Sequence, residues 1–133
     1  MTKTSDPTAN RAPRKAPEAK PIARLRLVFG PAAIVGPGRV ELLELVAEHG
    51  SLAAAGRAMK MSYKRAWGLV DELNRTFDAP LVALTRGGSA HGGATLTPLG
   101  AEVVERYRRM QSLSDAAIDD DLGALVGRLA QKE

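Results

Sequence analysis

Apolar residues in the middle of the chain recur every three to four positions, which is the spacing of helices that bury one face. The first predicted helix covers residues 39–48. Its apolar face is formed by Val40, Leu43, Val46 and Ala47. Gly50 follows the last apolar position, and a glycine there ends a helix because it adopts the left-handed conformation without a steric penalty.

Two shorter helices are predicted directly after residue 50, with a tight turn between them. Ser51 and Ser62 stand before the two apolar repeats and are expected to cap them, because a serine hydroxyl accepts a hydrogen bond from an unpaired first-turn amide. The inward-facing residues are Leu52, Ala55 and Met59 in the first repeat and Ala66, Val70, Leu73 and Phe77 in the second. Residues 50–77 are thus predicted to form a helix-turn-helix.

Short strands are predicted on both sides of this motif from alternating apolar positions. Residues 24–29 and 33–35 predict a small N-terminal hairpin. Residues 81–85 and 94–96 predict a second hairpin around the glycine-rich loop of residues 87–93. A hairpin directly after a helix-turn-helix is the wing of a winged helix.

Two amphipathic helices are predicted after the wing. Thr97 and Pro98 mark the start of the first, because proline at the first helical position lacks only an amide that would be unpaired in any case. Its apolar stripe consists of Leu99, Val103, Tyr107, Met110 and Leu113. The second has acids in its first turn, where they complement the helix dipole. Its residues are Asp119, Asp120 and Asp121, followed by the apolar positions Leu122, Leu125, Val126 and Leu129, with Ile118 before them.

The predicted fold is mainly α with a small β component. Residues 1–22 contain four prolines and almost no bulky apolar side chains, so we expect a disordered basic arm. Residues 23–97 are expected to form a winged helix-turn-helix domain with N-terminal strands and a β-hairpin wing. Residues 98–133 are expected to supply C-terminal helices that form a homodimer.

The charge distribution favours an anionic partner. The net charge is +4 and the pI is near 9.8, which is too small an excess to identify that partner. The surplus of Lys and Arg lies on residues 1–22 and 23–86, whereas acids outnumber bases in residues 115–133. The excess positive charge therefore lies on the arm and on the block that contains the predicted helix-turn-helix.

The third predicted helix begins with residues suited to double-stranded DNA. Lysine and arginine pair with phosphate or with guanine acceptors, and hydroxyl groups reach phosphates or base edges. Cations on the preceding helix and turn would hold the phosphate backbone. The candidate DNA-binding residues are Arg57, Lys60, Ser62, Tyr63, Lys64 and Arg65, with Arg86 and His91 from the wing loop.

Plainer interpretations exist for parts of this pattern. A Lys-Arg pair near a helix start is usually a solvated surface, and hairpin flexibility explains the wing glycines equally well. Trp67 is expected to be a core or half-buried anchor rather than a platform on which bases stack. Only the combination of the motif, its cations and the wing favours DNA binding.

Enzyme, metal and membrane functions find no support. The chain has no cysteine, which excludes disulfides, thiolate metal sites and a cysteine nucleophile. No nucleophile elbow, nucleotide-binding loop or metal-ligand cluster is present, so we expect no catalytic residue, cofactor or metal. No apolar run is long enough to span a bilayer, and the first twenty residues lack the apolar core of a secretory signal. We expect a cytoplasmic, nucleoid-associated protein.

The sequence resembles a known family over about residues 24–112. The segments that carry the resemblance are GRVELLELVAEHGSLAAAGRAMKMSYKRAWGLVDELNRTFDAPLVALTRGG and HGGATLTPLGAEVVERYRRM. They are similar to the N-terminal DNA-binding domain of ModE-type, molybdate-responsive bacterial regulators, and more distantly to LysR-type winged helices. The resemblance implies a dimer on a palindromic operator, DNA contact by Ser62, Tyr63, Lys64 and Arg65, and a link to molybdenum metabolism.

The resemblance does not carry molybdate binding to this chain. ModE-type oxyanion sites lie in C-terminal ligand domains, and residues 113–133 offer only a short helix. We therefore expect no oxyanion site within the chain. Two alternatives remain open: a winged-helix protein-interaction module that relies on a separate sensor, and direct oxyanion binding by this short chain.

Two positions depart from the family pattern. Lys60 occupies the turn where the family commonly has glycine, and a β-carbon in the left-handed conformation costs about 1 kcal/mol or more. Gly56 falls inside the second helix where alanine is usual, at a cost of up to about 1 kcal/mol. Both predict a looser motif.

Overall fold

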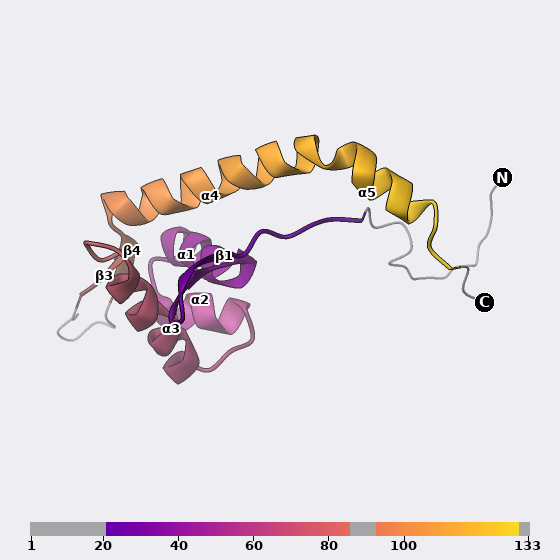
Figure 1. Cartoon of the computed structure of the whole chain (residues 1–133). Coiled ribbons are helices and arrows are strands. Elements are labelled where there is room, and N and C mark those ends of the chain that lie inside the picture. The colour runs from indigo at the N-terminus through magenta and orange to yellow at the C-terminus, as the bar shows by residue number, and fades with distance from the viewer. Residues whose placement is uncertain (1–20, 86–92, 131–133) are drawn as a thin grey trace, which may run out of the picture. The chain divides into compact units, whose positions relative to one another are not determined.

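The computed structural model describes residues 21–85 and 93–130 of the chain. Residues 24–116 form one compact unit, which holds the helix-turn-helix, both hairpins and nearly all of the long C-terminal helix. Within it, α4 runs along one side of α1, and α2 and α3 lie on the other side (Figure 1). The elements are β1 Leu27–Gly30, β2 Ala33–Val35, α1 Pro37–His49, α2 Leu52–Ala58, α3 Tyr63–Thr76, β3 Val82–Thr85, β4 Gly93–Leu96, α4 Pro98–Ala117 and α5 Asp119–Val126.

Helix α1 begins two residues before its predicted start, because Pro37 occupies its first turn. Gly50 ends it with φ of 67°, as predicted. The predicted apolar face is wrong in two places, since Leu42 is fully buried and Ala47 is exposed. Helix α1 packs against α2 and is also bound to α4, so its buried surface is wider than one stripe and includes the Leu42 side.

Helices α2 and α3 form the predicted motif with both caps in place. The hydroxyl of Ser51 accepts a hydrogen bond from the Ala54 amide at 3.1 Å, and that of Ser62 accepts one from the Arg65 amide at 3.0 Å. Gly56 is buried, and a β-carbon there would lie 3.2 Å from the β-carbon of Ala66. The glycine therefore allows α2 and α3 to pack closely. The sequence predicted only its cost to helix stability.

The wing is an antiparallel pair in which Val82 lies opposite Leu96 and Thr85 opposite Gly93. The Ala94 amide donates to the Gly50 carbonyl at 3.0 Å, which ties the first residues of β4 to the corner between α1 and α2. The loop between the strands, with Arg86 and His91, lies outside the described residues.

The N-terminal hairpin pairs β1 with β2 in antiparallel register, Leu27 opposite Val35. Strand β1 starts later than residue 24, where it was predicted to begin. The reason is that the Leu25 carbonyl accepts from the Tyr107 hydroxyl at 2.7 Å and the Leu25 amide donates to Gln111 at 3.2 Å, so α4 occupies both backbone groups. The expected disordered arm falls mostly outside the described residues.

Helix α4 starts where the sequence predicts. The Thr97 hydroxyl caps it by accepting from the Gly100 amide at 3.0 Å, and the same hydroxyl donates to the Pro80 carbonyl at 2.7 Å. The predicted stripe is covered only in its first half, because Tyr107 is buried whereas Met110 and Leu113 are 39% and 64% exposed.

A two-pronged ion pair fastens α4 to α1. The Arg108 guanidinium donates to both carboxylate oxygens of Glu44, at 2.8 and 2.7 Å. These hydrogen bonds hold the pKa of Glu44 below its ordinary value and raise the pKa of Arg108. Next to them, burial raises the pKa of Tyr107.

Helix α5 belongs to a second unit and has no buried residue of its own. Its first turn carries the three aspartates, as predicted. Within residues 21–85 and 93–130, no helix is long and apolar enough to cross a bilayer.

A substitution at Gly100 tests how closely Leu81, directly before β3, packs on α4. A β-carbon at Gly100 would lie 2.1 Å from the Leu81 carbonyl oxygen, a backbone atom that cannot rotate away. We expect Gly100→Ala to lower the free energy of unfolding by about 1–3 kcal/mol or more, as overpacking does. Urea denaturation measures this. The control is Gly38→Ala in the first turn of α1, where a β-carbon meets nothing within 4 Å. Equal stability of the two variants would contradict the close contact.

Candidate nucleic-acid interface

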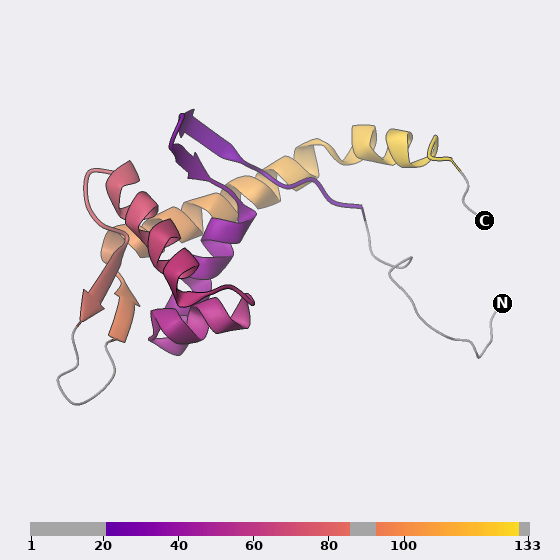
Figure 2. The same cartoon turned by 90° about the horizontal axis from the view of Figure 1, so that it is seen from below.

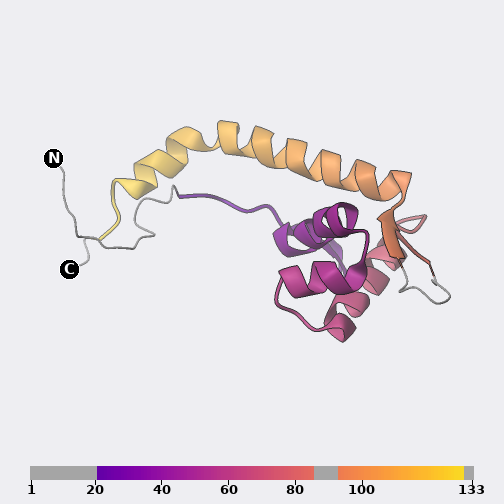
Figure 3. The ribbon, with the colours of Figure 1, turned by 180° about the vertical axis from the view of Figure 1, so that it is seen from behind.

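The outward face of α3 carries exposed residues along its length. Helix α3 lies on the side of the unit opposite α4, as the views from the front, from below and from behind agree (Figures 1, 2 and 3). Ala66, Val70 and Leu73 hold its inner face in the core. Its leading end is exposed, with Tyr63 at 56% and Trp67 at 46%.

Four cations lie within residues 57–65, around the turn that leads into α3. All are exposed: Arg57 near the end of α2, Lys60 in the turn, and Lys64 and Arg65 in the first turn of α3. None has an ion-pair partner among the residues that the structure describes. The helix dipole adds partial positive charge at the same point. The surface is therefore well suited to phosphate groups.

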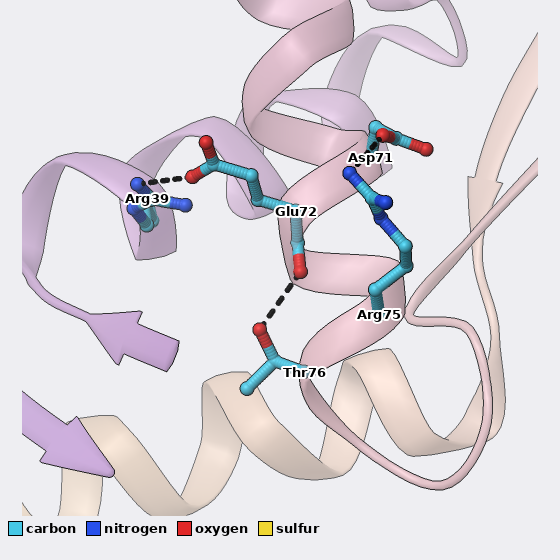
Figure 4. Close-up of polar contacts among 5 residues, drawn as sticks. All are labelled: Arg39, Asp71, Glu72, Arg75 and Thr76. Carbon is cyan, nitrogen blue, oxygen red and sulfur yellow. Dashed lines mark hydrogen bonds and ion pairs between the residues drawn. The ribbon is translucent and has the colours of Figure 1, made fainter. Parts of the chain in front are cut away.

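The acids of α3 are neutralised, by contrast. Asp71 pairs with Arg75 at 2.7 Å, and Glu72 pairs with Arg39 of α1 at 2.7 Å (Figure 4). The Thr76 hydroxyl donates to the Glu72 carbonyl one turn further on, at 2.8 Å. Carboxylates that would repel a phosphate backbone are thus matched by arginines, while the cations at the leading end keep their charge.

Ser62 has a structural role as well as a predicted binding role. Its hydroxyl oxygen caps α3, so it fixes the backbone of Arg65. The hydroxyl proton remains able to donate to an acceptor, because the cap uses only an oxygen lone pair.

The turn between α2 and α3 is held in a strained conformation. Lys60 has φ of 59°, and it is the one non-glycine residue with positive φ in the described part of the chain. The turn residue is thus left-handed, which is the condition under which the sequence predicts a cost for a β-carbon here. A left-handed residue with a β-carbon costs about 1–2 kcal/mol, and such strain tends to occur at functional positions. The Lys60 side chain is exposed, three residues before the start of α3.

Asn74 is a positioning residue that the sequence analysis missed. Its side-chain oxygen accepts from the Leu81 amide at 2.8 Å and the Val82 amide at 3.0 Å, and its nitrogen donates to the Val82 carbonyl at 3.1 Å. One amide therefore fixes the start of β3 against α3. The available signal was an asparagine in the last turn of the predicted helix, since asparagine side chains compete with backbone hydrogen bonds and disfavour helices.

Two aromatic side chains of α3, Tyr63 and Trp67, are exposed. They share a row with Asn74, since residues four and seven positions apart lie on one helix face. Asn74, in the last turn of α3, binds β3. Trp67 is 46% exposed, so it is less buried than the predicted core or half-buried anchor.

The structure thus brings together six of the eight predicted binding residues, from Arg57 to Arg65. The remaining two, Arg86 and His91, lie outside the described residues. In the same described ranges, no group of three or more His, Asp or Glu side chains is arranged to hold a metal ion.

Sequence comparison finds a matching family. The profile of the family described as "Bacterial regulatory helix-turn-helix protein, lysR family" matches residues 38–101. Residues 38–101 are therefore similar to LysR-type helix-turn-helix domains. The matched range runs from α1 through the first turn of α4 and so contains the whole motif and wing.

Curated relatives of this LysR-type domain have names that refer to molybdenum. The "Molybdenum-pterin-binding protein MopA" of Rhodobacter capsulatus is 38% identical over 84% of this chain and 41% of its own length. The "Molybdenum transport protein ModE" of Azotobacter vinelandii is 33% identical over 74% of this chain and 36% of its own length. The resemblance to ModE-type proteins is therefore confirmed, and this chain spans well under half the length of either relative.

Comparison with solved structures confirms the winged-helix fold. The protein in "Crystal structure of CbnR_DBD-DNA complex" superposes with a TM-score of 0.52 at 24% identity. The match covers 66% of this chain and 95% of that protein. At this identity the likeness shows the fold alone.

Asn74 offers a test of how the wing is held. Replacing it by alanine leaves the Leu81 and Val82 backbone groups without these side-chain partners, at a cost of about 1–3 kcal/mol. We expect Asn74→Ala to speed amide hydrogen exchange in the wing strands, residues 82–85 and 93–96, more than in α1. The control is Arg75→Ala, which removes an exposed neighbour on α3. Equal acceleration in the wing and in α1 would contradict the positioning role.

Proposed function

We propose that this chain is a DNA-binding transcriptional regulator that acts in the cytoplasm. The observation that carries the proposal is the uncovered leading end of α3, where four cations lack ion-pair partners among the described residues. The LysR-type family match supports it. In helix-turn-helix proteins, the leading residues of the second helix enter the major groove.

Each candidate residue has a proposed role. Lys64 and Arg65 contact phosphate or guanine, and Tyr63 donates its hydroxyl to the DNA. Arg57 and Lys60 hold the phosphate backbone and so fix the register of α3 in the groove. Ser62 combines capping with a hydrogen bond to DNA. Arg86 and His91 of the wing loop remain predicted contacts to the same duplex.

A link to molybdenum metabolism follows from the relatives. MopA and ModE carry names that refer to molybdenum-pterin binding and molybdenum transport, and the Escherichia coli relative is named "DNA-binding transcriptional dual regulator ModE". That relative is 32% identical over 62% of this chain. We therefore propose target genes of molybdenum uptake or use.

A homodimer on a palindromic operator completes the proposal. Met110 and Leu113 continue the buried stripe of α4 onto an exposed surface, which a second copy would cover. A two-fold dimer places its recognition helices about 34–36 Å apart, one turn of the duplex.

DNA reading is tested by a double variant at the leading end. We expect Lys64→Ala with Arg65→Ala to weaken binding to genomic fragments in gel-shift titrations. If both residues touch phosphates, the slope of log affinity against log salt becomes shallower by about 1.8. The control is Arg106→Ala with Arg109→Ala on α4, which removes the same charge from the other side of the unit. Negligible binding of the wild-type chain at low salt, or equal losses for both double variants, would contradict the proposal.

The dimer is tested on α4. We expect the wild-type chain to be a dimer at micromolar concentration in light scattering, and Leu113→Glu to be a folded monomer, because a carboxylate in an apolar interface is costly to desolvate. Ser112→Glu adds the same charge at a neighbouring exposed position and should stay dimeric. A monomeric wild-type chain would rule out this interface.

A further inference from the structure

Gly68 lies in the second turn of α3, and the fold gives no packing reason for a glycine there. A β-carbon at Gly68 would meet no neighbouring group within 4 Å. The buried helical glycines differ, because a β-carbon at Gly56 would press on Ala66 at 3.2 Å and one at Gly100 would overlap the Leu81 carbonyl. Gly56 and Gly100 are thus required by close packing, and Gly68 is not.

The backbone does not require glycine at this position either. Among the described residues, Gly50 is the one glycine with positive φ, so Gly68 has a conformation that alanine adopts freely. Alanine also stabilises a helix interior relative to glycine, because glycine loses more backbone freedom when the chain folds. The chain therefore gives up stability at residue 68 without any gain inside the protein.

The open position faces the side on which the cations lie. Gly68 follows Lys64 by one turn, and residues four positions apart share a helix face. It lies away from the stripe of Ala66, Val70 and Leu73 that holds α3 in the core. The adjacent residue, Trp67, is 46% exposed. Gly68 thus leaves the backbone without a side chain on a face that also carries a cation and lies next to an exposed aromatic residue.

We propose that Gly68 is a close-approach position, where the α3 backbone meets a thymine methyl group in the major groove. This inference rests on the proposed DNA-binding function. A glycine has no side chain that could hydrogen-bond a base, so the group it faces is read by shape. The apolar group that base pairs display in the major groove is the C5-methyl of thymine, and an apolar protein surface recognises it.

The test adds one methyl group to the protein and removes one from the DNA. The variant is Gly68→Ala, and the probe is the genomic fragment that the wild-type chain binds most tightly, amplified with either thymidine or deoxyuridine triphosphate. Deoxyuridine lacks the C5-methyl group but pairs in the same way. The affinity of the wild-type chain on both probes provides the reference, since deoxyuridine also alters DNA shape.

We expect Gly68→Ala to raise Tm by about 4–8 °C, as replacing a helical glycine does in a domain of this size. On thymidine DNA the affinity should fall about tenfold or more, which is the scale of one base contact. On deoxyuridine DNA most of that loss should disappear, because the new β-carbon occupies the space of the missing methyl group. The control is Gly123→Ala in α5, an equally open helical glycine, which should leave affinity unchanged.

The outcomes separate this inference from the function on which it rests. If Gly68→Ala binds thymidine DNA as tightly as the wild-type chain does, the close approach is overturned while DNA binding stands. An equal loss on both DNAs would overturn the thymine contact. Absence of salt-dependent binding by the wild-type chain would instead overturn the proposed function itself.

Discussion

The hydrogen bonds of the Asn74 side chain are the constraint on which the arrangement of motif and wing depends. They fix the first residues of β3 to the recognition helix. Further hydrogen bonds secure β4. The amide of Ala94, the second residue of β4, donates to the Gly50 carbonyl. Thr97, directly after β4, donates from its amide to the Leu81 carbonyl and from its hydroxyl to the Pro80 carbonyl. The wing is therefore held by α3 through β3 and by the corner between α1 and α2 through β4, so a duplex would meet elements whose spacing is set before binding.

The charges of the motif are organised around the same helix. The acids in its second half each have an arginine partner, one on α3 and one on α1. The leading cations have no ion-pair partner in the described ranges, so an anion that neutralises them would have to come from outside those ranges. Exposed ion pairs contribute little to stability, typically less than about 1 kcal/mol. The pairs on α3 consequently shape the electrostatic surface more than they hold the fold.

Local rules predict much of this fold from sequence, and long-range contacts account for the differences. The caps Ser51 and Ser62 and the helix end at Gly50 were predictable because each depends on residues within one turn. The start of β1 was not, because α4, more than eighty residues away, occupies the backbone groups of Leu25. Asn74 was missed for a similar reason: its partners lie beyond Pro80, where no periodic pattern connects them to α3. The cations at the leading end were predictable as candidates, whereas their lack of partners required the fold.

The left-handed turn residue Lys60 has a consequence for protein engineering. A library screened for thermal tolerance alone would enrich glycine at residue 60, since glycine adopts φ of 59° without strain. That change would also delete one of the four leading cations. Under the proposed DNA-binding function, selection for heat resistance and selection for DNA affinity would therefore favour different residues at position 60.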